Sequence, residues 1–178
     1  MVWELIRAAA LTAFCLLFLS TASGIILSYK RLNGEGYQFV HFLHDSCSVG
    51  GLIFVIIHMM LLLFDQYVHF SILNIVLPFS TSYKPFSVAL GIGTFYIFVL
   101  IILTSAVVNL RKKHMKLWHV IHLLAYPAFF MGLFHGLLTG TDASRLFVTL
   151  MYYAAGVTVL TLSTFRVFFR PVKRRSER

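Results

Sequence analysis

The sequence carries little charge for its length. Of its 178 residues, 12% are Asp, Glu, Lys or Arg and only six are acidic, whereas 59% are apolar. An ordinary soluble domain contains about 25% charged and about 45–50% apolar residues. This scarcity of charge excludes water as the main solvent of the chain, so we expect an integral membrane protein.

Other features of soluble enzymes are also missing. The sequence has no low-complexity linker, no Gly-rich phosphate loop and no soluble segment large enough to bind a nicotinamide or a flavin. Its two cysteines, Cys15 and Cys47, fall within apolar stretches, where a free cysteine is usually a small core residue. We therefore expect no disulfide framework, and NAD(P)H oxidation cannot be assigned to this chain.

Long apolar runs account for almost the whole chain. A membrane-spanning helix needs about 20 largely apolar residues, and five such runs are present: 5–29, 39–64, 88–110, 118–138 and 146–165. The first run lacks a small-residue cleavage pattern, so we interpret it as a retained helix and not as a signal peptide. We predict an all-α bundle of five transmembrane helices, in a single domain over 1–170 with a basic tail over 171–178.

The basic residues lie at the joints between the apolar runs. Twelve of them fall on one side of a five-span topology: Lys30, Arg31, Arg111, Lys112, Lys113, Lys116, Arg166, Arg170, Lys173, Arg174, Arg175 and Arg178. The other side has three: Arg7, Lys84 and Arg145. The positive-inside rule then predicts an external N-terminus and a cytoplasmic C-terminus, in a multi-pass protein of the inner (plasma) membrane. Topology explains the formal charge of +9, so we expect lipid headgroups and no nucleic acid as partners.

Histidines are the informative residues of this apolar chain, because ionisable groups within spans are expensive and indicate function. His44 and His58 are fourteen residues apart, which places them within about 40° on one helix face and about 21 Å apart along the axis. His122 and His135 are thirteen residues apart, or about 140° out of phase on an ideal helix. Pro127 lies between them and allows a kink or local unwinding that changes this phase.

The two histidine pairs are predicted to share two levels of the membrane. Both ligand-bearing spans run from the cytoplasm outward, so His44 and His122 form an inner pair, and His58 and His135 an outer pair. Two imidazoles at each level are typical of haems that carry electrons and do not bind oxygen. The haems would be b-type, because the sequence has no Cys-x-x-Cys-His motif for covalent attachment.

The other four histidines have an ordinary explanation at the membrane surfaces. His41, His114 and His119 lie near the cytoplasmic interface, and His69 lies in the external connection. Asp45 is expensive within a span unless it is paired, and we expect it to pair with His41 one turn earlier. Asp45 is also a candidate proton acceptor if the electron donor is a quinol.

Residues between the two levels have two interpretations each. Gly50 and Gly51 stand midway between His44 and His58, where a porphyrin or a neighbouring helix would approach closely. Three phenylalanines also lie between the levels, where they would either bridge the haems or fill the core: Phe54, Phe129 and Phe130.

The longest connection joins the second and third runs over 65–87. It contains an apolar run at 70–79 with Pro78 and Pro85, and we interpret it as an interfacial segment or cap on the external surface. The residues at this surface where an external substrate would dock are the following: His69, Tyr83, Lys84 and Gly140-Thr141-Asp142.

The chain resembles the ferric reductase-like transmembrane family over about 41–166. The resemblance rests on the stretches LPFSTSYKP, LTS before a basic connection, and KLWHVIHLLAYPAFFMGLFHGLLTGTD. This family includes the membrane cores of ferric reductases and NADPH oxidases, and the haem subunit of the periplasmic methionine sulfoxide reductase system. The resemblance implies that the two histidines on one helix, His44 and His58, and the two on the other, His122 and His135, supply the axial ligands of two b haems, one histidine from each helix to each haem. Members commonly have six spans; the first is absent here, as is the flavin and nicotinamide domain.

Three functions are compatible with these features. The leading one is transmembrane electron transfer, from a cytosolic flavoprotein or a membrane quinol to an extracytoplasmic acceptor, in a haem-bearing oxidoreductase subunit. Flavin or quinone would then act only through a partner. The second is a haem-binding membrane anchor or assembly subunit without turnover of its own. The third, a metal transporter, is disfavoured because its ligands would have to converge within one coordination sphere.

Overall fold

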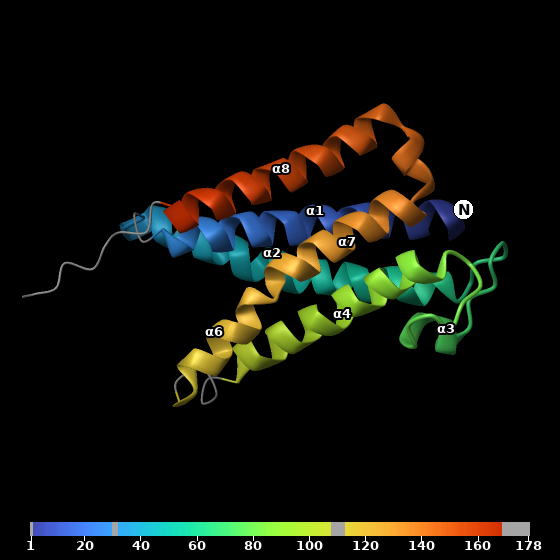
Figure 1. Ribbon diagram of the computed structural model, residues 1–178, viewed down its shortest axis with the longest axis horizontal. Helices are drawn as coiled ribbons and strands as arrows, with labels where there is room; N and C mark the ends of the chain where they lie inside the picture. The colour runs from blue at the N-terminus through green and yellow to red at the C-terminus, as the bar shows by residue number, and fades with distance from the viewer. Residues whose placement is uncertain (1, 30–31, 108–112, 169–178) are drawn as a thin grey trace, which may run out of the picture.

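The computed structural model describes residues 2–29, 32–107 and 113–168 of the chain, and helices are its only regular structure there. The elements, labelled in Figure 1, are α1 (Val2–Ser28), α2 (Gly34–Leu62), α3 (Ile72–Val76), α4 (Pro85–Ala106), α6 (Met115–Leu123), α7 (Ala125–Thr139), the short 3₁₀ helix η1 (Thr141–Ser144) and α8 (Leu146–Phe168). This confirms the predicted all-α class.

Five helical segments are long and apolar enough to cross a membrane: α1, α2, α4, the combined α6–α7 segment (Met115–Thr139) and α8. The five predicted spans are therefore confirmed, with shifts at their ends. Helix α2 begins at Gly34, five residues before the apolar run, with Glu35 in its first turn. A helix N-terminus favours an acidic side chain, so polar residues extend the helix beyond the part that hydropathy detects. The predicted third span ends at 110, outside the described residues.

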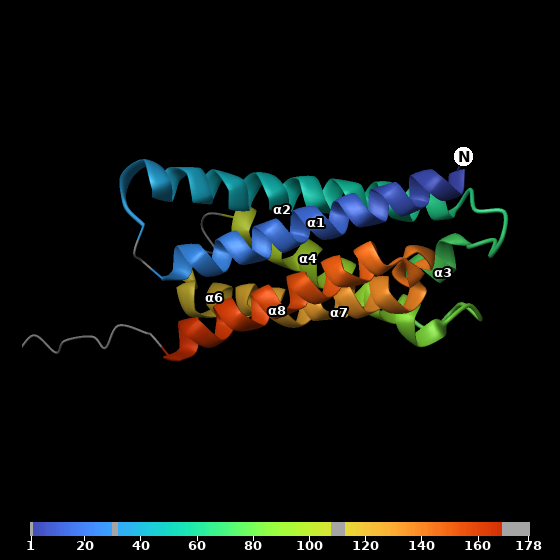
Figure 2. The same ribbon diagram turned by 90° about the horizontal axis from the view of Figure 1, so that it is seen from above.

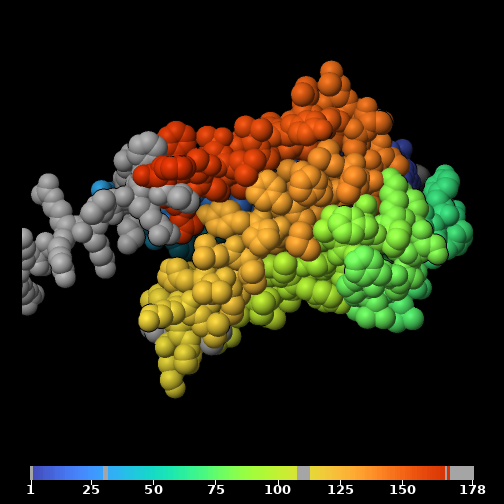
Figure 3. Space-filling view, in the orientation of Figure 1, coloured from blue at the N-terminus to red at the C-terminus, as the bar shows by residue number. Residues whose placement is uncertain are grey.

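Two antiparallel helix pairs form the framework. Helices α1 and α2 pack along their whole length, with Ser20 opposite His44 and Ile6 opposite His58. Helix α4 is antiparallel to the α6–α7 segment, with Ser87 opposite His135. Figure 2 shows the α1–α2 pair on one side of the bundle and α4, α6, α7 and α8 on the other. The space-filling view shows α4, α7 and α8 side by side across one face (Figure 3).

The core lies where α1, α7 and α8 meet. Phe129 is buried there and contacts Phe14, Phe18 and Phe130. Of the three phenylalanines between the histidine levels, Phe129 thus fills the core. Most other large apolar side chains are on the outside, including Phe42, which is 67% exposed. An exposed apolar surface of this extent is what lipid chains require of a spanning protein.

The fourth span is broken at Leu124, between α6 and α7. The Leu124 N–H bonds the Ile121 carbonyl in a tighter turn, and α7 resumes at Ala125. Pro127 explains the break, because it has no N–H for the carbonyl four residues earlier and its ring collides with that carbonyl. The break predicted from this proline is confirmed, and it lies between His122 and His135.

The connection after α2 folds over the end of the bundle that holds the N-terminus (Figure 1). It contains α3, which is fixed by a reciprocal capping box between Ser71 and Asn74. Ile72 and Leu73 of α3 are 68% and 64% exposed. A short helix that exposes apolar side chains at the end of a membrane bundle fits the predicted interfacial segment.

Candidate functional site

The inner pair is brought together from two different helix pairs. His44 lies on α2 and His122 on α6, and their ring centroids are 6.1 Å apart with an angle of 57° between the planes. A metal–imidazole nitrogen bond of about 2.0–2.1 Å, as in zinc sites, places two imidazole centroids on opposite sides of one metal about 6.3 Å apart. The observed separation therefore fits two axial ligands of one iron.

The outer pair faces one cavity near the opposite end of the bundle. His58 of α2 and His135 of α7 both line it, and its volume is about 210 Å³. One buried water needs roughly 10–15 Å³ measured in this way, so the cavity is far larger than a packing defect. Its walls are mainly apolar side chains, with Arg7 and Asp142 among the few charged ones.

Three of the four histidines bond a backbone carbonyl on a neighbouring helix. His44 Nδ1 lies 2.8 Å from the Ser20 carbonyl, His58 Nδ1 lies 3.0 Å from that of Ile6, and His135 Nδ1 lies 2.7 Å from that of Ser87. A carbonyl only accepts hydrogen bonds, so Nδ1 carries the proton and donates it, while the Nε2 lone pair stays available. Metal-binding histidines are typically held in this way.

Two glycines make room for two of these three hydrogen-bonded rings, those of His44 and His135. A Cβ at Gly24 would lie 2.9 Å from His44 Cε1, and one at Gly91 would lie 2.7 Å from His135 Nδ1. Each glycine follows its acceptor serine by four residues, in the pattern Ser-x-x-x-Gly at 20–24 and again at 87–91. Small residues at this spacing let a neighbouring helix approach closely. Sequence reasoning did not single out either glycine, although the repeated pattern was available.

His122 is held differently from the other three. Its Nδ1 is buried and is the one buried side-chain nitrogen or oxygen without a hydrogen-bond partner among the described residues. Its ring stacks on Trp118, with centroids 4.8 Å apart and 29° between the planes. Trp118 Nε1 in turn donates to Ser105 Oγ of α4 at 3.2 Å.

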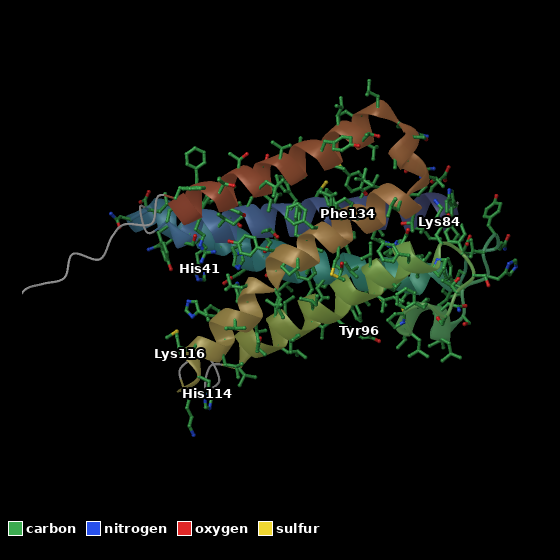
Figure 4. The ribbon with its side chains drawn as sticks, viewed as in Figure 1. His41, Lys84, Tyr96, His114, Lys116 and Phe134 are labelled. Atoms are coloured by element: carbon green, nitrogen blue, oxygen red, sulfur yellow. The ribbon has the colours of Figure 1, made fainter. Side chains whose placement is uncertain are left out.

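Burial separates the predicted ligands from the other histidines. His44, His58, His122 and His135 are partly buried, whereas the remaining four are exposed: His41, His69, His114 and His119. The positions of His41 and His114 fit their expected place near one membrane surface. Both side chains lie toward the end of the bundle opposite Lys84 (Figure 4). The expected contact between His41 Nδ1 and Asp45 Oδ2 is present at 3.2 Å.

Gly51 serves the packing of α1 on α2, where a Cβ would meet the Leu17 side chain at 2.7 Å. Of its two interpretations, helix approach is the one that the structure supports. At the opposite surface, Lys84 Nζ donates to the Leu138 carbonyl at 2.6 Å, and Asp142 pairs with Arg7. These charged groups already have partners within the chain, which leaves them little freedom to dock a substrate.

The ligand-type side chains form pairs and no larger clusters. In the described ranges, no three His, Cys, Asp or Glu side chains come together in a way that could hold a metal ion. A transition-metal or zinc site made by side chains alone needs at least three such ligands. Haem iron needs only one or two protein ligands. The three carbonyl-bonded imidazoles, each with Nε2 free, are compatible with that smaller requirement.

Comparison with known proteins places the chain in a family without giving it a function. No curated protein and no solved structure matches it. The model of one protein family, described as "Domain of unknown function (DUF8596)", matches residues 1–142. That range includes all four predicted ligands, the three acceptor carbonyls and both cradle glycines. Since the match covers most of the chain, this protein belongs to the DUF8596 family.

Proposed function

We propose that the chain binds two b-type haems, one at each histidine pair, and conducts electrons across the membrane in the manner of ferric reductase-like proteins. The observation that carries the proposal is the second coordination sphere. His44, His58 and His135 each donate Nδ1–H to a backbone carbonyl of a facing helix. This arrangement fixes the tautomer and directs Nε2 away from the acceptor helix.

Each residue then has a defined task. His44 and His122 would hold the inner haem, and His58 and His135 the outer one, with ligands at each level drawn from α2 and from the α6–α7 segment. Bound haem supplies reversible one-electron chemistry at its iron, and two axial histidines favour electron transfer over oxygen binding. The protein contributes the ligands, their orientation and an apolar surrounding that excludes water.

The direction of transfer follows from the charge distribution. Lys116 lies in the first turn of α6, the helix that holds His122, Lys113 just precedes that helix, and Arg166 lies near the end of α8 and close to His122; basic residues favour the cytoplasmic side. We therefore propose a cytosolic flavoprotein or a membrane quinol as donor and an extracytoplasmic acceptor. Reporter fusions at the two termini test this orientation: an external N-terminus and a cytoplasmic C-terminus are expected, and the reverse would invert the proposed direction.

The decisive experiment is an optical spectrum of the purified protein, oxidised and dithionite-reduced, with haem quantified per chain. Two low-spin b haems are expected. His58→Ala should retain the inner haem and His44→Ala the outer, because the levels are about 21 Å apart along α2. His41→Ala and His119→Ala are controls that should keep both. A His41 variant that loses a haem while the His44 variant keeps two would overturn the assignment.

Transmembrane transfer separates a conduit from a haem-binding anchor. In liposomes that contain the protein, an external reductant should reduce an encapsulated ferric complex. Both the His44 and the His58 variants should abolish this reduction. An anchor would bind the same haems but leave the encapsulated acceptor oxidised.

A further inference from the structure

The ligand set contains one exception that asks for a physical explanation. Three histidines are oriented by backbone carbonyls, whereas Nδ1 of His122 has no acceptor within the described chain. His122 also lies next to the break at Leu124, in α6, which is only nine residues long. A short helix beside a break is a weak support for a ligand that must be held within about 0.5 Å.

Trp118 provides the missing support. It precedes His122 by one helical turn, so the two side chains lie on the same face of α6. The indole and imidazole rings are stacked, with centroids 4.8 Å apart. Stacking restricts rotation of the imidazole, but only if the indole is itself held in place.

Ser105 holds the indole from the facing helix. Its hydroxyl oxygen accepts the Trp118 Nε1–H at 3.2 Å, and it lies near the end of α4. The contact continues the antiparallel register in which α4 also supplies the Ser87 carbonyl to His135. Helix α4 thus contacts both histidines of the α6–α7 segment, directly at His135 and through Trp118 at His122.

We propose that Ser105 and Trp118 are positioning residues for His122, acting as a side-chain tether where the other ligands have a backbone carbonyl. The inference rests on the proposed function, since it assigns a role toward an inner haem. It implies that the two haem sites are held unequally. Both ligands of the outer site are held by main-chain carbonyls, whereas at the inner site only His44 has a main-chain acceptor and His122 depends on the Ser105 hydroxyl through Trp118.

The test uses the full-length protein in detergent and a spectroscopic readout. The g-values of a low-spin bis-imidazole iron report the relative orientation of its two imidazole planes. Ser105→Ala and Trp118→Phe should shift or broaden the signal of one haem and weaken its binding by roughly 10–100-fold, the usual effect of losing a second-sphere contact. Ser105→Thr, which keeps the hydroxyl, should restore the wild-type signal.

Thr104→Ala is the matched control, because the Thr104 hydroxyl bonds carbonyls of its own helix. It should leave both signals unchanged. The tether would be refuted if Ser105→Ala and Trp118→Phe kept both wild-type signals, or if the signal lost with His58→Ala were the one that moved. If Ser105→Ala does not fold, Trp118→Phe decides alone. Wild-type protein without two haems would contradict the proposed function itself, a result that these variants do not influence.

Discussion

Replacing Gly91 by alanine is the sharpest structural perturbation of the outer site. The added Cβ would lie 2.7 Å from Cε1 and Nδ1 of His135 and 3.0 Å from its Cγ. Non-bonded carbon atoms prefer about 3.5–4.0 Å, so the imidazole or the helix must retreat by roughly 1 Å. A bond of 2.7 Å to the Ser87 carbonyl would then exceed the usual limit of about 3.2 Å.

Two effects of this substitution have opposite signs. Alanine in a helix interior is favoured over glycine by about 1 kcal/mol, which should stabilise α4. Loss of the second-sphere hydrogen bond should weaken metal binding by roughly 10–100-fold, or about 1.4–2.7 kcal/mol. We therefore expect Gly91→Ala to lose the outer haem from a protein that still folds.

Gly93→Ala is the control that changes the helix propensity of α4 without touching a histidine ring. It lies on the same helix, and its Cβ would meet only the terminal methyl of Met131, which is flexible and can move away. Haem content per chain, measured in detergent, should fall from two to one for Gly91→Ala and stay at two for Gly93→Ala. The reasoning is refuted if both variants keep two haems with unchanged spectra, or if both lose one.

Two further predictions concern the framework. Pro127→Ala should let α6 and α7 merge and rotate the inner histidine away from its partner, so that haem content falls to one per chain; Pro85→Ala, at the start of α4 where proline is tolerated, should keep two. Asp142→Asn should leave the Arg7 guanidinium without its carboxylate partner and lower the free energy of unfolding by roughly 1–3 kcal/mol, seen as a lower thermal midpoint by circular dichroism. The Arg145 side chain is 69% exposed, so Arg145→Ala should change the thermal midpoint little. A drop in the midpoint as large as that of Asp142→Asn would contradict the assignment of the stabilisation to the Arg7–Asp142 pair.

The spans and the histidine levels could be predicted because both are properties of a single helix. Hydropathy identifies a span, and residue spacing gives the height of His44 and His58 on it. The break near Pro127 was predictable for the same reason, since proline acts on its own helix. The structure then adds the proximity of His44 and His122, while their role as haem ligands stays a prediction.

The orienting contacts could not be predicted because they depend on the register between helices. The sequence points to Gly50 and Gly51 because they lie between two histidines on one helix. The glycines that contact the histidine rings are instead Gly24 and Gly91, on helices that carry no predicted ligand. Nothing within α1 says which of its carbonyls faces His44. That information exists only once α1 and α2 are aligned, with Ser20 and Ile6 opposite the two histidines.

The division of ligands between two helix pairs has a consequence for biosynthesis. The α1–α2 pair is complete when residue 62 has been inserted, and it already contains two oriented imidazoles with their acceptors. Neither level has its second imidazole until the α6–α7 segment follows, so the proposed haems would gain both ligands only late in the assembly of the bundle, with α8 alone still to be inserted. Haem supply during translation should therefore leave membrane insertion unaffected, and chains truncated before α6 should accumulate in the membrane as haem-free hairpins.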